Sequence, residues 1–385
     1  MFLIFIIIFS IAVLVVSVMY PFVLVLARKH KVLDNPNERK LHRNPMPVMG
    51  GVAVWFGIAA ACALECILPD IQYPFICLVC MTLMMLVGLW DDVCNITPAL
   101  RILLETLVLW LLMMWGGRYA NDFHGLMGIG YFNMGFSVPL SIVGGIGIIN
   151  SINLIDGVDG YCSGYCIMAS LLFSVLFFRA GDVAMGAFAI ACAGALIPFF
   201  LHNVFGRDTK MFIGDCGSLM MGMAMTYFVF YAIAHNGSCS KLSAEGVDLI
   251  SYALAVLSVP VIDTLRVMTV RIARRRSPFS PDKTHLHHLF IDAGFSHVGA
   301  AMACILMGLT VFCIWLLSYL AGASANLQFV VTVLSGGTLV IIFYALMRIA
   351  QRNDSVYWKT LCRIGTFTHR EGSRWWAFVT RRVDK

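Results

Sequence analysis

The sequence predicts an all-α, polytopic integral membrane protein with about eleven transmembrane helices. Its 385 residues are 60% hydrophobic and 12% charged, whereas a soluble domain has about 25% charged residues. Several apolar runs reach the roughly 20 residues that cross the hydrocarbon core of a bilayer. Basic residues also alternate between successive loops, as in multi-pass membrane proteins.

Hydropathy along the chain places the expected spans and divides the chain into two parts. The first span has no basic stretch before it and no small-residue cleavage site after it, so we expect a retained helix. The fifth is short and rich in glycine, and a re-entrant helix there would change the count. One membrane domain is expected over residues 1–348, followed by a basic, aromatic cytoplasmic tail over 349–385. The spans are residues 2–27, 49–68, 73–90, 101–116, 137–152, 161–178, 183–201, 211–234, 249–270, 299–320 and 327–347.

The basic residues predict the orientation. We number the loops along the chain, beginning with the loop after the first span. Of the 27 Lys and Arg residues, the even-numbered loops hold only Arg118, Arg179 and Lys241. The odd-numbered loops are therefore expected to be cytoplasmic, with the N-terminus outside and the C-terminus inside. The net charge of +6 comes from basic residues concentrated in these loops, a distribution that indicates a membrane protein and not a nucleic-acid-binding protein. The Arg and Trp residues of the tail suit anionic lipid headgroups, and a tail that only fixes topology is equally compatible.

Four polar motifs lie at the expected cytoplasmic ends of spans, three of them after a span and the Asp215 motif at the entry to span eight. Carboxylates at a bilayer are costly without partners, and these acids have no bases beside them in the sequence. A divalent cation would resolve their repulsion, and Mg²⁺ or Mn²⁺ prefers oxygen ligands and commonly shares them with a substrate diphosphate. The alternative is ordinary helix capping, with Asp215 or Ser218 capping span eight. The motif residues are Asp91 and Asp92; Asn153, Asp156 and Asp159 in NLIDGVDG; Asp215 in FIGDCGS; and His285, His287 and His288 in HLHH.

The histidine motif allows two interpretations. Three histidines within four residues can bind zinc, but the nearby loop offers no further nitrogen or sulfur ligands. The motif follows three arginines, Arg274 to Arg276, and guanidinium and imidazole groups both bind phosphate oxygens. We prefer phosphate or nucleotide binding, while the arginines serve equally well as a topology anchor. Asp263 is expected to pair with Arg266, and Glu105 needs no catalytic role.

The motifs, in this order, resemble the polyprenyl-phosphate N-acetylhexosamine-1-phosphate transferase family, the MraY/WecA superfamily. The resemblance extends from about Arg28 to about Phe295. The spacing of HLHH is similar to the WecA-like branch, because the MraY branch carries three consecutive histidines. The strings that carry the resemblance are DNPNERKLHRNPMPVMGG, GLWDD, NLIDGVDG, MFIGDCGSLMMG and SPFSPDKTHLHH.

The resemblance implies Mg²⁺-dependent transfer of a sugar 1-phosphate from a UDP-sugar to undecaprenyl phosphate, with release of UMP. The branch resemblance favours GlcNAc-1-phosphate as the transferred group. It implies a multi-pass protein of the bacterial inner membrane with its site on the cytoplasmic face, and a homodimer is an open possibility. By motif, Asp215 and Asn153 correspond to metal ligands and Asp91 and Asp92 to the catalytic acids. The implied substrate-binding residues are Arg43, Asn153, Asp156, Asp159, Arg276, His285, His287 and His288.

Three other functions stay open from the sequence. A UDP-MurNAc-pentapeptide transferase of peptidoglycan synthesis shares the motifs apart from the histidine spacing. A proton-coupled transporter also uses intramembrane acids, but such sites lie near the bilayer midplane in repeated halves, and no repeat is visible here. A non-catalytic scaffold would leave the acids in glycine-rich turns without a role. For the transferase, both direct displacement and an aspartyl-phosphate intermediate are chemically sound.

Overall fold

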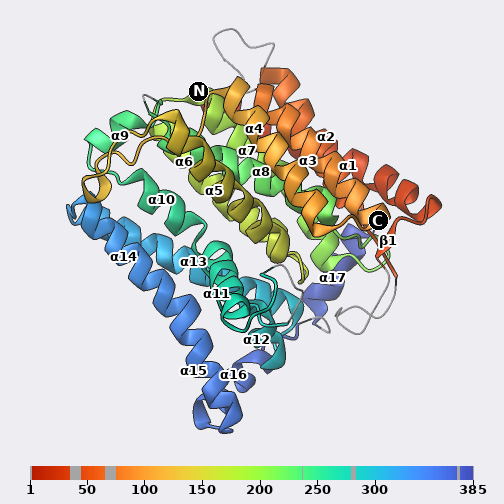
Figure 1. Cartoon of the computed structure of the whole chain (residues 1–385). Coiled ribbons are helices and arrows are strands. Elements are labelled where there is room, and N and C mark those ends of the chain that lie inside the picture. Colours follow the sequence, from red (N-terminus) through yellow and green to blue (C-terminus); the bar gives the residue numbers. More distant parts are fainter. Residues whose placement is uncertain are drawn as a thin grey trace.

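The computed structural model describes residues 2–34, 45–65, 75–235, 237–278, 283–370 and 373–384. Arg43 lies outside the described residues. Apart from helices, these residues form one antiparallel pair of two-residue strands, β1 (Leu33–Asp34) and β2 (Met46–Pro47). Figure 1 shows the helices gathered in one bundle, with α15 and α16 extending from its lower end. The expected all-helical membrane fold is therefore confirmed.

Helix α8 (Gly214–Ile233) is the most buried span of the bundle. Its sequence is apolar on every side, so it has no polar face to present to water. The fold places 94% of its apolar window inside the molecule. Neighbouring helices α2, α3, α5, α6 and α10 surround it. The residues at its ends are thereby held by the rest of the bundle.

The remaining helices follow the hydropathy of the chain. A short π-helical stretch, η2 (Thr338–Ile342), joins α14 and α15 into one apolar helix, and a 3₁₀ turn, η1 (Leu126–Gly128), lies in the loop before α5. The bounds are α1 Phe2–Lys29, α2 Gly50–Glu65, α3 Phe75–Cys94, α4 Pro98–Gly116, α5 Met134–Leu154, α6 Tyr161–Arg179, α7 Val183–Phe205, α9 Ser240–Ala244, α10 Leu249–Val256, α11 Ser258–Ala273, α12 Leu286–Asp292, α13 His297–Leu320, α14 Ala325–Gly337, α15 Phe343–Arg352, α16 Val356–Thr366 and α17 Arg374–Val383.

The number of spans differs from the expected eleven. In the described part of the chain, nine helices are long and apolar enough to cross a membrane, or ten if one bent pair counts as a span. The expected second span is the 16-residue helix α2. The ninth is bent by 79° between α10 and α11, three residues before Pro260, whose missing N–H interrupts helical hydrogen bonding. The fifth, α5, is a continuous helix of 21 residues despite its glycines.

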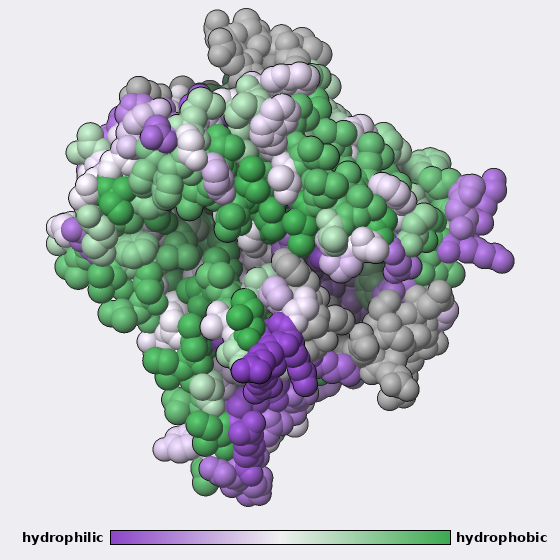
Figure 2. Space-filling view, in the orientation of Figure 1, coloured by the Kyte–Doolittle hydropathy of each residue, from purple (hydrophilic) through white to green (hydrophobic). Residues whose placement is uncertain are grey.

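The outer surface of the bundle is apolar. Figure 2 shows hydrophobic residues over most of the body and hydrophilic residues gathered at its lower end and at its right edge. Large side chains such as Phe22, Trp115 and Val143 are 66%, 76% and 71% exposed. A water-soluble protein rarely exposes so much contiguous apolar surface. The surface is therefore suited to the hydrocarbon of a bilayer.

Glycines allow α2 and α3 to approach the start of α8 closely. A Cβ on Gly51 would lie 2.3 Å from Gly217 Cα, and a Cβ on Gly88 would lie 2.3 Å from the Asp215 carbonyl oxygen. Both obstacles are backbone atoms, which cannot rotate away. Small residues are common where membrane helices approach closely.

Gly88→Ala is therefore expected to lower the free energy of unfolding by about 1–3 kcal/mol, the usual cost of overpacking. The measurement is the thermal unfolding midpoint of the purified protein in detergent. Gly147→Ala is the control, since a Cβ there meets nothing within 4 Å and alanine favours the helix. Equal midpoints for the two variants would contradict the close contact between α3 and α8.

Candidate functional site

Three helix ends meet at one end of the bundle. Helices α3 and α5 end there and α8 begins there, which brings Asp92, Asn153 and Asp215 together. The chain before α8 is fixed by backbone hydrogen bonds: Phe212 N donates to Pro47 O at 2.9 Å and Gly50 N donates to Phe212 O at 3.0 Å. Separate sequence motifs thus converge on the first turn of α8.

Asp92 caps α8 from the neighbouring helix. Its carboxylate oxygens accept hydrogen bonds from Asp215 N at 3.0 Å and from Cys216 N at 3.1 Å. Gly214 has a φ of +73°, a conformation that glycine adopts without strain, and a Cβ there would lie 2.6 Å from Asp92 Oδ2. Asp92 therefore satisfies N–H groups that would otherwise lack partners at the helix start.

This arrangement corrects the capping alternative for Asp215 and Ser218. The residue before α8, Ile213, makes no side-chain cap, and Ser218 Oγ donates to Gly214 O at 3.0 Å. The Asp215 carboxylate instead accepts a hydrogen bond from Asn153 Nδ2 at 2.5 Å, and Asn153 also donates to Ser218 Oγ at 2.9 Å. Asp92 supplies the cap, and within the described residues the second Asp215 oxygen accepts no hydrogen bond, so it is left for another ligand.

Asp91 points into a different environment. It is 9% exposed, and its oxygens accept from Ile96 N at 3.0 Å and from Arg101 Nη1 at 3.4 Å. Arg101 also donates to Asn150 Oδ1 at 3.2 Å, and Asn150 donates to Glu105 Oε2 at 2.6 Å. The expectation that the acids lack bases is wrong for Asp91, because α4 carries Arg101 back to it. The sequence signal for this network was the presence of Arg101 and Glu105 four residues apart in an otherwise apolar helix.

Asp159 is also paired with bases, contrary to expectation. Its Oδ2 lies 2.7 Å from Lys210 Nζ and 2.9 Å from His297 Nδ1. Burial opposes ionisation of the carboxyl, but the hydrogen bond from His297 and the charge of Lys210 outweigh it and lower the pKa of Asp159. The sequence analysis missed both bases. The position of Lys210 directly before MFIGD was the available signal for one of them.

Asp156, unlike Asp159, pairs with no basic side chain among the described residues. Its half-buried carboxyl makes no hydrogen bond or ion pair with any side chain in the described ranges. Burial raises its pKa, and the charges of Asp215 and Asp92 add to the effect. The site therefore contains acids that repel one another, which favours a bound cation or a proton.

His285 and His287 are buried, and His287 lies beside the NLIDGVDG loop. His285 Nδ1 lies 2.9 Å from Asp263 Oδ2, and Arg266 Nη2 donates to Asp263 Oδ1 at 2.6 Å, so the expected pairing of Asp263 with Arg266 is confirmed. A Cβ on Gly157 would lie 3.1 Å from His287 Nε2, which places His287 against that loop. Burial and the neighbouring imidazoles lower the pKa of His287.

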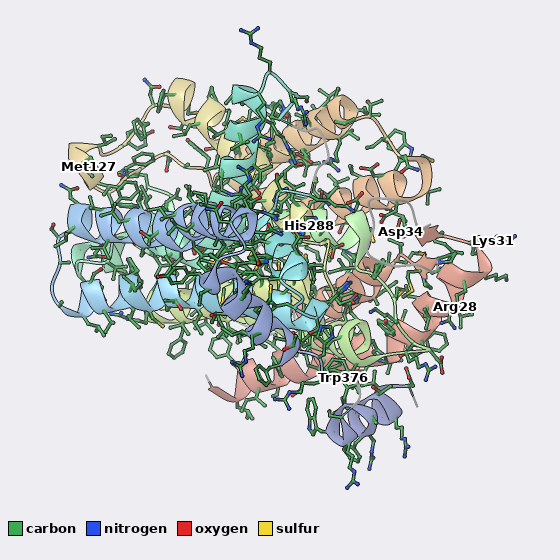
Figure 3. All side chains as sticks on the ribbon, turned by 90° about the horizontal axis from the view of Figure 1, so that it is seen from below. Arg28, Lys31, Asp34, Met127, His288 and Trp376 are labelled. Atoms are coloured by element: carbon green, nitrogen blue, oxygen red, sulfur yellow. The ribbon has the colours of Figure 1, made fainter. Side chains whose placement is uncertain are left out.

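The remaining two predicted residues lie further out. The half-buried His288 ring is 4.3 Å from the His287 ring. In Figure 3, His288 lies near the middle of the view from below, between Met127 on one side and Lys31 on the other. Arg276 is exposed after the end of α11, and within the described residues it forms no ion pair with the carboxylates.

The donor set fits a hard divalent cation such as Mg²⁺. Among the residues that the structure describes, no three His, Cys, Asp or Glu side chains form a ready-made metal cage. Mg²⁺ does not need one, since it commonly binds one or two carboxylates and takes its other ligands from water and substrate phosphate. Asp215, with one oxygen held by Asn153, and the nearby Asp156 offer such a partial oxygen set.

Comparison with known proteins gives a consistent result. The family model described as glycosyl transferase family 4 matches residues 74–233. The decaprenyl-phosphate N-acetylglucosaminephosphotransferase of Mycolicibacterium smegmatis is 30% identical over 298 residues, covering 72% of this chain and 73% of that protein. The undecaprenyl-phosphate alpha-N-acetylglucosaminyl 1-phosphate transferases of Yersinia pestis and Escherichia coli K12 are 29% and 28% identical, covering 70% of this chain and 72% of each relative.

Proposed function

Because the chain belongs to glycosyl transferase family 4, a family of phospho-N-acetylhexosamine transferases, we propose that it transfers GlcNAc-1-phosphate from UDP-GlcNAc to undecaprenyl phosphate and releases UMP. This reaction would begin the assembly of a lipid-linked cell-surface glycan. The observation that carries the proposal is the convergence of Asp92, Asn153 and Asp215, which join the ends of three helices. The Asp215 carboxylate and the Asn153 side-chain oxygen can bind a cation that also binds a diphosphate.

In the proposed site, Asp215 and Asn153 would hold Mg²⁺, the cation implied by the family. A bound Mg²⁺ would offset the charge of the UDP-sugar diphosphate and of the departing UMP. The protein's part is to orient its ligands. Asn153 Nδ2 donates to Asp215 Oδ1 at 2.5 Å, which fixes the orientation of that carboxylate.

The contacts of the paired acids favour direct displacement. The acceptor phosphate oxygen forms its new bond to the phosphorus that carries the sugar, while the bond from that phosphorus to the UMP oxygen breaks. A covalent route needs a free aspartate as nucleophile. Asp92 has both oxygens in backbone hydrogen bonds and Asp91 is paired with Arg101. We therefore assign Asp92 to positioning α8 and Asp91 to orienting the acceptor through the Arg101 network.

The bases and histidines suit the anionic nucleotide. Lys210 and His297 both contact Asp159. These contacts hold the three side chains in fixed positions, where they can form hydrogen bonds with the nucleotide. His287 lies against Gly157 of the same loop, with the His288 ring 4.3 Å from it, and imidazole N–H groups donate to phosphate oxygens. Arg276, exposed on its loop, and Arg43 remain proposed phosphate contacts.

We place the lipid tail in an apolar hollow of the bundle. The hollow lies between α5, α8, α10 and α11, and the 79° bend between α10 and α11 shapes one side of it. A polyprenyl chain needs such an apolar path because its tail stays in the hydrocarbon while its phosphate reaches the site. The lining residues are Ile148, Val229, Ile233, Ile250, Ala253, Leu254, Leu257 and Val261.

Ala253→Trp is expected to raise the KM for undecaprenyl phosphate about tenfold by filling this hollow, while the KM for UDP-GlcNAc stays unchanged. Initial rates of UMP release at varied lipid and nucleotide concentrations measure both constants. Leu265→Trp is the matched control, because Leu265 is 58% exposed on α11 outside the hollow. A normal lipid KM in Ala253→Trp would remove the hollow from the lipid path.

The central test is an assay with radiolabelled UDP-GlcNAc, undecaprenyl phosphate and Mg²⁺. Label should enter the lipid phase with an equal amount of UMP released. UDP-GalNAc and UDP-MurNAc-pentapeptide, tested in parallel, report sugar preference. Inside-out and right-side-out vesicles test the proposed cytoplasmic site, which predicts transfer of added UDP-GlcNAc only in inside-out vesicles. Absence of lipid label with every UDP-sugar would refute the proposal.

A further inference from the structure

The tail after α15 folds back onto the end of the bundle where the site lies. In Figure 1 α17 lies at that end of the bundle, and Asp384, directly after α17, accepts hydrogen bonds from Arg207 N and Thr209 N in the loop before α8. The tail lies beyond residues 74–233, which the family model matches. We propose that this tail is a strap whose residues Thr368 and Asp384 position the two bases of Asp159. The inference rests on the proposed function of Asp159 in the substrate site.

The first attachment of the strap is at Thr368. Ser296 N donates to Thr368 Oγ1 at 2.8 Å, and Ser296 Oγ donates to Thr368 O at 3.0 Å. A Cβ on Gly299 would lie 2.5 Å from Thr368 Cβ, so the strap lies directly on the first turn of α13. Ser296 is the N-cap of α13 and precedes His297. This contact therefore fixes the backbone from which His297 reaches Asp159.

The second attachment is at Asp384. Its Oδ1 accepts from Arg207 N at 3.1 Å, from Thr209 N at 3.2 Å and from Thr209 Oγ1 at 2.7 Å. Partial burial opposes its ionisation, but the hydrogen bonds to Thr209 and Arg207 outweigh it and lower the pKa of Asp384. These bonds fix the loop between α7 and α8, in which Lys210 follows Thr209.

Aromatic packing keeps α17 over this loop. The Trp376 ring lies 4.7 Å from the Phe205 ring, and the Trp375 ring lies 5.7 Å from it. Figure 3 shows Trp376 on α17 at the rim of the molecule. The helix thereby delivers Asp384 to the Arg207–Thr209 backbone. Without such packing, holding a mobile tail in one conformation would cost more entropy.

Both attachments act on the same carboxylate oxygen. Lys210 Nζ and His297 Nδ1 each contact Asp159 Oδ2, and each base is one residue from a strap contact. Besides these bases, Asp159 faces the charge of Asp156 on its own loop. When a lysine on a loose loop forms an ion pair, the loop backbone loses conformational freedom as well, a cost that a fixed loop does not add. The strap therefore favours the paired state of Lys210.

The first measurement is the rate of acetylation of Lys210, followed by mass spectrometry on the full chain in detergent. Asp384→Ala is expected to increase that rate about fivefold, as expected for loss of one net hydrogen bond, because the ion pair protects the amine. Asp384→Asn, which keeps an acceptor, should restore most of the protection. Asp354→Ala is the matched control, since Asp354 pairs only with the exposed Lys359 among the described residues of the tail. Wild-type labelling of Lys210 in Asp384→Ala would overturn the proposal.

The second measurement is the pH dependence of UMP release. Lys210→Met leaves His297 as the only base beside Asp159 among the described residues, so burial raises the pKa of Asp159 above its wild-type value and the acid limb of the profile should move to higher pH. Asp384→Ala should move the acid limb in the same direction. The double variant with Asp384→Ala and Lys210→Met should show the same shift as Lys210→Met alone. Additive shifts would show that Asp384 acts elsewhere and would overturn the strap. If the wild type releases no UMP, the proposed function fails, while the labelling result still decides the strap.

Discussion

Asp215→Asn is expected to lower the rate of transfer at least about 1000-fold, the scale of losing a charge that stabilises a phosphoryl-transfer transition state. Asparagine has the same shape and can still accept the hydrogen bond from Asn153. The start of α8 is capped by Asp92 through the backbone, so this cap survives the substitution. The fold should therefore persist while the cation loses its charged ligand.

The measurement for Asp215→Asn is single-turnover transfer over a range of Mg²⁺ concentrations, with the unfolding midpoint measured beside it. Ser218→Ala is the control on the same helix turn, because Ser218 accepts from Asn153 but carries no charge. It should lose about tenfold or less. Full activity of Asp215→Asn at saturating Mg²⁺ would remove Asp215 from the metal site.

Asp92→Asn is expected to lower transfer about 100-fold and the free energy of unfolding by about 1 kcal/mol. An amide has one acceptor oxygen, whereas the Asp92 carboxylate accepts from both Asp215 N and Cys216 N. One N–H of α8 is then left facing the amide NH₂ group. The first turn of α8 moves, and the Asp215 side chain moves with it.

Asp182→Asn separates activity from stability in this experiment. Asp182 also caps a helix, since its Oδ1 accepts from Met185 N at 3.0 Å at the start of α7, at the opposite end of α6 from the NLIDGVDG loop. We expect a similar loss of stability with nearly normal turnover. Equal losses of turnover in Asp92→Asn and Asp182→Asn would show that Asp92 acts only through global stability.

The membrane fold follows from local sequence, but details of the spans do not. Apolar runs long enough for a bilayer predicted α1, α3 to α8 and α13 because hydrocarbon accepts only a backbone whose hydrogen bonds are satisfied internally. The bend at Leu257 was missed because the run from 249 to 270 stays apolar through it. Pro260 was the available signal, and hydropathy does not register it.

The motifs identified the acids of the candidate site, and the structure shows how their surroundings differ. Asp91 and Asp92 are adjacent in sequence, yet one pairs with Arg101 and the other caps α8. Helical residues one position apart point about 100° away from each other, so neighbours in the chain enter different environments. Which acid meets which base depends on the packing of the helices.

The polar clusters at the ends of apolar runs were thus determined by the sequence alone, because charged residues are excluded from hydrocarbon and gather at its boundary. Only the tertiary structure decided that Lys210 and His297 share Asp159, and that Asp384 and Thr368 hold the chain beside them. Those contacts join residues 51 to 175 positions apart. Hydrogen bonds and ion pairs act over a few ångströms, so only packing that brings distant segments together can create them.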